Sequence, residues 1–168
     1  MGIEIRPSKK EELQQLERME DVSFNVNGKY FKNGVLPPLP EEDKDAYSFR
    51  ALWEKVDTET WTILIEEEIA GGAVVKDIST DKKEVALFFI SSQIQGKGYG
   101  QKALRMIEES YPEVTTWRLV TPTQVIRNAV FYINKCGYSI VSVVDWDEEN
   151  ECGMFVFEKK CGRDRNDC

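Results

Sequence analysis

The sequence contains no histidine, and this absence excludes many catalytic mechanisms at once. Ser-His-Asp triads, Cys-His pairs and zinc sites held by imidazole all need that side chain. A general base must therefore be a carboxylate, a lysine, a tyrosine, a thiolate or a bound water molecule. The four cysteines form no Cys-x-x-Cys pair, so no metal site is expected. Free thiols are predicted at all four positions, with a bond between Cys161 and Cys168 as the alternative.

Long apolar runs and an excess of positive charge are missing as well. No stretch reaches the ~18 consecutive apolar residues of a membrane-spanning helix, and the N-terminal residues do not resemble a secretory signal. A cytoplasmic protein without a membrane partner is therefore expected. The 30 acidic residues outnumber the 22 basic ones and give a formal net charge of −8, which argues against nucleic acid as a partner. The 168 residues are expected to form one domain over residues 1–160 and a polar tail over residues 161–168.

Hydrophobic periodicity predicts a succession of strands and helices. Strands are expected at residues 3–6, 61–66, 69–77, 85–90, 117–120, 138–146 and 153–158. Helices are expected at residues 9–20, 41–55, 98–109 and 125–135. The order β-α-α-β-β-β-α-β-α-β-β predicts an α/β (α+β) fold, with a mixed central sheet flanked by helices. Residues 85–90 are apolar at every position, which is typical of a central strand covered on both faces.

The segment 22–40 does not follow either periodicity. Its asparagines, glycines and prolines disfavour regular structure, yet Phe24, Tyr30, Phe31 and Leu36 make it too apolar for a free linker. Loops with several aromatic residues usually lie against another part of the protein. We therefore expect this loop either to pack over the edge of the core or to form a wall of a substrate pocket.

A glycine-rich turn, Gln95 to Gly100, lies between the predicted central strand and an amphipathic helix. The start of a helix leaves unpaired N–H groups that point at one spot, with a partial positive charge behind them. Glycines let an anion approach this backbone closely, so a phosphate or diphosphate site is expected, with a turn that binds nothing as the alternative. Gln101 stands where the Rossmann pattern has its last glycine, and the P-loop sequence is absent, so neither of these nucleotide motifs fits.

Two motifs follow one another along the chain. Gln95, Gly98 and Gly100 form the pattern Gln-x-x-Gly-x-Gly, and the helix expected at 125–135 contains Asn128-Ala129-Val130-Phe131-Tyr132 shortly before a Gly-Tyr pair. In this order and spacing, the two motifs resemble those of the GNAT superfamily of N-acetyltransferases over about residues 3 to 158. Asn128 departs from the alanine that many members have at that position.

The resemblance implies acetyl-CoA as co-substrate and no metal. Backbone N–H groups of the glycine-rich turn are expected to bind the diphosphate, and the backbone of residues 89–91 is expected to bind the pantetheine arm. The cofactor-binding residues implied in this way are Phe89, Ile90, Ser91, Gln95, Gly96, Lys97, Gly98, Tyr99, Gly100, Gln101, Asn128 and Phe131.

The resemblance also implies two catalytic residues. Tyr132 matches the family's tyrosine that points at the CoA sulfur, and an ordinary pKa of ~10 keeps it protonated as a general acid. Simple packing at the core edge is the alternative for this side chain. Glu84 matches a glutamate that many members use as general base. The alternatives are a solvent-facing strand end for Glu84, with another acid such as Glu66 to Glu68, or water, as the base. Cys136 is not expected to act as a nucleophile, because no histidine can activate it.

These observations favour an acetyl-CoA-dependent N-acetyltransferase that moves an acetyl group to a primary amine by direct transfer in a ternary complex. The acceptor is expected to be a small-molecule amine or a peptide or protein amine, and the chain a monomer or homodimer. The alternative is a CoA-binding sensor or partner module without turnover.

Overall fold

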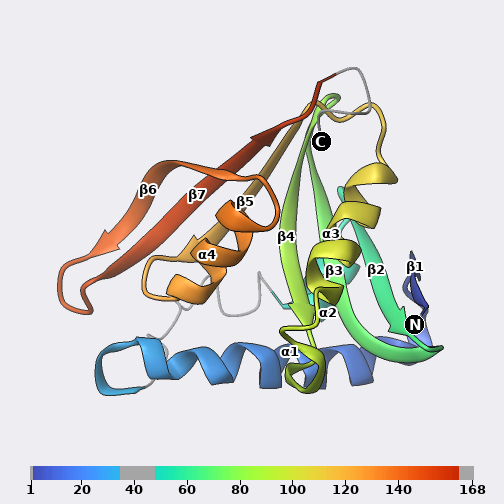
Figure 1. Ribbon diagram of the computed structural model, residues 1–168, viewed down its shortest axis with the longest axis horizontal. Coiled ribbons are helices and arrows are strands. Elements are labelled where there is room, and N and C mark those ends of the chain that lie inside the picture. The colour runs from blue at the N-terminus through green and yellow to red at the C-terminus, as the bar shows by residue number, and fades with distance from the viewer. Residues whose placement is uncertain (1, 35–47, 163–168) are drawn as a thin grey trace.

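The structure, a computed structural model, describes residues 2–34 and 48–162. Within these ranges seven strands form one sheet in the order β1-β2-β3-β4-β5-β7-β6 (Figure 1). The strands are β1 (Ile3–Pro7), β2 (Thr58–Ile65), β3 (Glu68–Ser79), β4 (Lys82–Ile90), β5 (Thr116–Pro122), β6 (Ser139–Asp147) and β7 (Cys152–Lys160). Neighbouring strands are antiparallel, except β4 and β5, which are parallel. The predicted α/β class with a mixed sheet is confirmed.

Helices cover both faces of this sheet. The α-helices of the described ranges are α1 (Leu13–Asn25), α2 (Phe49–Trp53), α3 (Tyr99–Glu109) and α4 (Ile126–Asn134), and the 3-10 segments are η1 (Lys10–Glu12), η2 (Val26–Tyr30), η3 (Lys32–Gly34) and η4 (Ser92–Ile94). Leu16 of α1 and Phe49 of α2 pack with Val74 on one face. Leu104 of α3 packs with Val75 on the other face. Successive residues of β3 thus point to opposite layers, as alternation along a strand requires.

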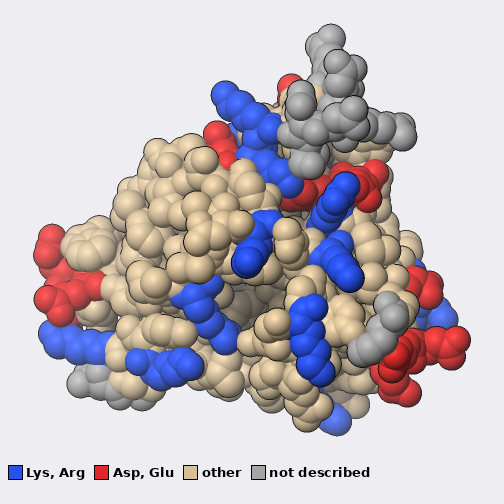
Figure 2. Space-filling view, viewed as in Figure 1, with Lys and Arg blue, Asp and Glu red and all other residues tan. Residues whose placement is uncertain are grey.

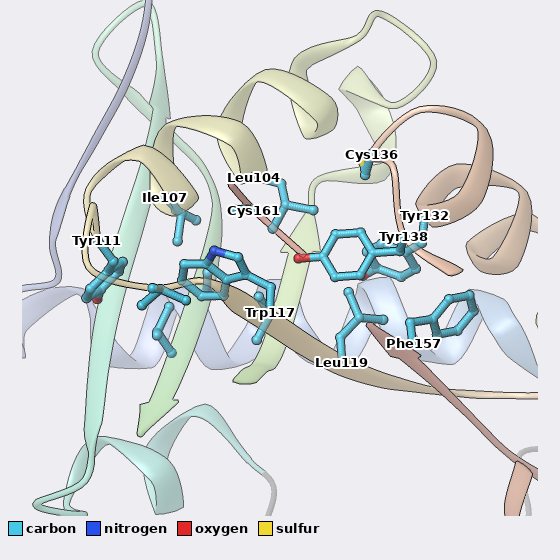
Figure 3. Packing of buried hydrophobic residues seen from close by; sticks show 14 of the residues in the cluster. Leu104, Ile107, Tyr111, Trp117, Leu119, Tyr132, Cys136, Tyr138, Phe157 and Cys161 are labelled. Carbon is cyan, nitrogen blue, oxygen red and sulfur yellow. The ribbon is translucent and has the colours of Figure 1, made fainter. Parts of the chain in front are cut away.

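The larger core lies between α3, α4 and the strands β5 and β7 (Figure 3). Trp117 and Leu119 of β5, Phe157 of β7 and Leu104 of α3 are each at most 2% exposed. Burying a side chain of this kind contributes about 1.5–3 kcal/mol relative to leaving it in water. This packing holds α3 firmly against the sheet, so the glycine-rich turn at its start has a fixed position beside β4.

The parallel strands β4 and β5 separate along their length, as Figure 1 shows. They pair only through Lys82–Glu84 of β4 and Thr116–Arg118 of β5. Beyond Glu84, β4 pairs with β3 and β5 pairs with β7. Among the described residues, no strand covers the remaining edge of β4 as far as Ile90. The backbone groups of that edge are therefore available to a ligand.

Two predicted segments differ in the structure. The described part of the segment 22–40 is helical, because α1 continues to Asn25 and two 3-10 segments follow it up to Gly34. Of the helix expected at 41–55, the structure describes α2, which begins after Ser48; the rest of that prediction lies outside the described residues. The side-chain Oγ of Ser48 accepts the backbone N–H of Ala51 at 3.1 Å and caps the helix.

The cysteines also differ in part from expectation. Cys136 and Cys152 are free thiols, whereas Cys161 is disulfide-bonded, so the prediction of a free thiol is wrong at Cys161. Within the described ranges, no helix has both the length and the apolarity needed to cross a membrane.

Candidate active site

A cleft of about 530 Å³ opens where β4 and β5 part. Its walls come from the end of β4, the turn before α3, the helix α4 and the last turns of α1 with η2. Most of the residues predicted to bind the cofactor line this cleft, namely Phe89, Ile90, Gln95, Gly96, Gly98, Gly100, Gln101, Asn128 and Phe131. Ser91, Lys97 and Tyr99 are not among the lining residues. The fold thus brings together two motifs that are well separated in sequence.

Positive charge surrounds the cleft even though the chain as a whole is acidic. Figure 2 shows Lys and Arg side chains around a hollow near the centre of this face, while the acidic side chains lie toward the edges of the view. Arg127 and Lys135 line the cleft directly, and no Asp or Glu of the described residues does so. This distribution favours an anionic ligand.

The glycine-rich turn presents backbone donors to the cleft. Gly96 and Gly98 both have φ of +80°, a conformation that other residues adopt only with strain, and Gly98 is the N-cap of α3. A Cβ atom at either position would meet no other atom within 4 Å, so the space in front of the turn is open. The first turn of α3 also leaves N–H groups without partners inside the helix. The arrangement can bind a phosphate or diphosphate.

The side chain of Gln95 joins three parts of the cleft. Its Nε2 donates to the carbonyl oxygen of Ile90 at 3.0 Å, and its Oε1 accepts a hydrogen bond from Nη1 of Arg127 at 3.1 Å. Gln101 makes a second cross-connection, because its Nε2 donates to the carbonyl oxygen of Lys135 at 2.6 Å. These side chains therefore fix the turn against β4 and α4.

Tyr132 lines the cleft and also belongs to the core, where Figure 3 shows its packing. Its ring packs against Phe131, Tyr138 and Phe157, with ring centroids 5.1, 5.9 and 5.7 Å away. Burial, with a smaller contribution from the nearby Cys136, raises the pKa of Tyr132 well above its ordinary value. The hydroxyl is therefore a hydrogen-bond donor at physiological pH.

The structure does not bring Glu84 to the cleft. Glu84 lies where β4 and β5 are still paired, and its carboxylate forms an ion pair with the guanidinium of Arg118 on β5. Its side chain is 14% exposed. The six residues from Glu84 to the end of β4 span about 20 Å of strand. The geometry therefore gives no support to the prediction that Glu84 is the base.

Cys136 is a buried thiol beside Tyr132. Burial raises the pKa of Cys136 to about 12, and the negative charge of Glu108 adds to this effect. The thiol is therefore protonated at physiological pH, and only the thiolate is a good nucleophile. The electrostatics thus agree with the expectation that Cys136 does not attack an acyl group.

Sequence reasoning predicted one wall of the cleft only as an alternative and missed part of another. Ser23, Phe24 and Asn27 of α1 and η2 line the cleft opposite the glycine-rich turn. This is one of the two outcomes left open for segment 22–40, namely a pocket wall, although its backbone is helical. Arg127 and Phe88 line the cleft as well. Arg127 precedes the motif residue Asn128, and a cation at the start of that helix was the available signal.

Glu20, one turn before Ser23 on α1, is a buried carboxylate. It is 7% exposed, and its Oε2 accepts the backbone N–H of Phe49 at 2.9 Å. The pKa of Glu20 is raised to about 7, chiefly by burial; the N–H of Phe49 opposes this rise, and the carboxylates of Asp21 and Glu17 contribute to it. No Lys or Arg within residues 2–34 and 48–162 forms an ion pair with Glu20.

Comparison with known proteins relates this cleft to acetyl transfer. A family model described as "Acetyltransferase (GNAT) family" matches residues 22–138. The uncharacterized protein YrkN of Bacillus subtilis (strain 168) is 34% identical over 114 residues, which are 67% of this chain and 60% of YrkN. The chain thus matches less than two thirds of the length of this relative.

Solved structures share the fold at low sequence identity. The PaiA N-acetyltransferase of Thermoplasma acidophilum, solved with coenzyme A, has a TM-score of 0.69 and 22% identity over 96% of this chain and 100% of that one. The spermidine N-acetyltransferase of Vibrio cholerae, solved with CoA and spermine, has a TM-score of 0.67 and 11% identity over 94% of this chain and 95% of that one.

Proposed function

The chain belongs to the GNAT family of acetyltransferases, and from this premise we propose that it transfers the acetyl group of acetyl-CoA to a primary amine. The observation that carries the proposal is the cleft beside the glycine-rich turn, which combines backbone donors, cations and a free strand edge. CoA matches these features, because its anionic diphosphate suits the donors and cations, and the amide groups of its pantetheine arm suit the strand edge.

The residues of the cleft fit acetyl-CoA along its length. The N–H groups that follow Gly98 would bind the diphosphate, with Arg127 and Lys135 adding positive charge. The open edge of β4 near Phe89 and Ile90 would take the pantetheine amides by strand-like hydrogen bonds. Tyr132, which also lines the cleft, would then lie near the sulfur.

When bound, acetyl-CoA supplies a thioester whose carbonyl carbon accepts the lone pair of the amine. The C–N bond forms, the C–S bond breaks with its electron pair on sulfur, and an ammonium acceptor yields an amide, a thiol and one proton. Direct transfer needs no nucleophile from the protein, which agrees with the protonated state of Cys136.

Tyr132 would serve the leaving group. Because burial raises the pKa of Tyr132 so far, its hydroxyl is better suited to donate a strong hydrogen bond to the leaving sulfur than to lose its proton completely. Water is the simplest acceptor for the proton of the amine, because Glu84 is engaged with Arg118 and no described carboxylate lines the cleft.

One structural neighbour suggests the class of acceptor. The Vibrio cholerae protein was solved in complex with CoA and spermine, a cationic amine. We extend this to the present chain as a proposal: the acceptor is a small-molecule or peptide amine that is cationic in solution.

Release of free thiol from acetyl-CoA tests the proposal, with a panel of primary amines as acceptors. We expect release with at least one amine, and Tyr132→Phe to lower kcat about 10- to 100-fold while the affinity for acetyl-CoA is kept. Tyr138→Phe is the matched control, since that hydroxyl donates to Glu108 at 2.6 Å in the core and lies away from the cleft. Thermal stabilisation by acetyl-CoA without thiol release from any amine would contradict turnover and favour a CoA-binding sensor.

A further inference from the structure

Asn27 is an anomaly in the wall of the cleft. Its side chain is 95% buried (5% exposed), yet its Oδ1 atom has no hydrogen-bond partner. Among the described residues, it is the one buried side-chain polar atom that lacks a hydrogen-bond partner. A buried polar atom without a partner costs about 1–3 kcal/mol of stability, so such an atom calls for an explanation.

The position of Asn27 supplies that explanation. Asn27 lines the cleft from η2, opposite the turn that precedes α3. Because Asn27 lines the cleft, a ligand that brings an N–H or O–H group to this wall would satisfy its oxygen. The nearby carbonyl oxygen of Ile90, at the end of β4, already takes hydrogen bonds from Gln95 and Ser23.

The negative charge near this wall also favours a ligand that brings hydrogen-bond donors. Glu20 stands on the face of α1 that also carries Ser23 and Phe24, because these residues are three and four positions further on, and η2 with Asn27 follows directly after α1. Within residues 2–34 and 48–162, the charged groups that act on Glu20 are the acidic Glu17 and Asp21, and Arg50 of α2 is engaged with Glu17. A cation near this wall would therefore be attracted by a carboxylate with which no described Lys or Arg pairs.

We propose that Asn27 accepts a hydrogen bond from the amino group of the acceptor substrate, and that Glu20 makes this subsite selective for cationic amines. This inference rests on the proposed function in one respect, namely that the bound amine receives the acetyl group. The subsite itself is defined by Asn27 and the cleft. The cleft then has two chemically opposite ends. Donors and cations at α3 and α4 take the anionic co-substrate, and acceptors at α1 and η2 take the amine.

Replacement of Asn27 separates this role from a structural one. Asn27→Leu has a similar volume and removes the unsatisfied oxygen, so its melting temperature is expected to equal or exceed that of the wild type. Its KM for the amine is expected to rise about 10- to 100-fold, with the KM for acetyl-CoA and kcat close to wild type. Asn25→Leu is the matched control, because Asn25 is exposed on the outer side of α1 and should leave all three parameters unchanged.

A direct probe needs no turnover. The side-chain NH₂ signal of Asn27, assigned by its loss in Asn27→Leu, is followed by NMR in CoA-saturated protein. Spermidine and n-butylamine are the cationic probes, and butyrate is the matched anion. We expect the signal to shift with both amines and to stay in place with butyrate.

The outcomes distinguish the two proposals. A signal that moves with butyrate and not with the amines, or that ignores both amines at tens of millimolar, overturns the amine subsite. An unchanged amine KM in Asn27→Leu does the same. A wild-type protein that releases no thiol from acetyl-CoA with any amine contradicts the proposed function, whereas a shift of the Asn27 signal by spermidine still supports the subsite.

Discussion

The two walls of the cleft use opposite hydrogen-bonding groups. The wall at α3 and α4 offers N–H groups after Gly98 and the side chains of Arg127 and Lys135, which are all donors. The wall at α1 and η2 offers the acceptor oxygen of Asn27, and the buried carboxylate of Glu20 lies about two helical turns before it. A single ligand of one charge cannot satisfy both walls. This difference is the basis of our proposal that the site takes two partners, an anion and an amine.

A variant that distorts the wall at α3 and α4, here called the donor wall, gives the strongest test of the contrast between the two walls. Gly98→Val places a β-branched residue at φ of +80°, which forces the turn to relax and moves the N–H groups that follow. We expect the affinity for acetyl-CoA, measured by calorimetry, to fall about 100-fold, or about 2.7 kcal/mol, which corresponds to the loss of one charge-assisted hydrogen bond.

Gly137→Val is the control for strain alone. Gly137 has φ of +79°, and an added Cβ would meet only Lys159 Cε at 3.8 Å, but it lies after α4 and does not line the cleft. Both variants should lose similar stability, and only Gly98→Val should lose the co-substrate. Equal affinities in the two variants would show that the donor turn does not bind acetyl-CoA.

The acceptor wall can be tested through its buried charge. Burial raises the pKa of Glu20 from 4.5 to about 7, so between these pH values the folded protein holds a proton that the unfolded chain releases. Stability is therefore expected to fall as pH rises through this window. Glu20→Gln cannot ionise and keeps an oxygen for the N–H of Phe49, so it should exceed the wild type above pH 7 by up to roughly 3 kcal/mol.

Denaturant unfolding at several pH values measures this effect. The curves of wild type and Glu20→Gln are expected to converge at acidic pH and to separate at alkaline pH. Glu17→Gln serves as the control, because Glu17 is partly exposed and bonded to Arg50 and should show no such divergence. Parallel curves for Glu20→Gln would mean that the carboxylate is not held in an unfavourable environment.

The smallest expected effect concerns the positive charge of the donor wall. Arg127→Ala removes one cation from the cleft and frees Oε1 of Gln95, and we expect the affinity for acetyl-CoA to fall about 3- to 10-fold, less at high salt. Arg105→Ala, on the exposed side of α3, should leave the affinity unchanged. The KM for the amine should stay constant in both variants; a rise in Arg127→Ala alone would mean that the two walls are not independent.

Local patterns were enough to predict one wall of the cleft. The apolar run of β4, the glycines at positive φ and the helix with Phe131 and Tyr132 each act through their own neighbours in sequence, so periodicity and turn chemistry could identify them. The mixed sheet followed from the same periodicity, with strand ends displaced by a few residues.

Contacts between distant segments could not be predicted in this way. Asn27 has no motif around it, and only the path of α1 across the sheet brings it opposite α3. Glu84 was placed on the correct strand, but its partner Arg118 comes from the register of β5, which the sequence does not encode locally. The polar composition after Asn25 predicts a loop, whereas the structure has short 3-10 segments there.

Amide chemical shifts test the central claim most directly, since they report on both walls in one experiment. On adding CoA, the backbone N–H signals of Gly98, Gly100 and Gln101 should move, and on adding spermidine to that complex the side-chain signal of Asn27 should follow. Backbone signals at Gly98 to Gln101 that stay unchanged at millimolar CoA would contradict the account.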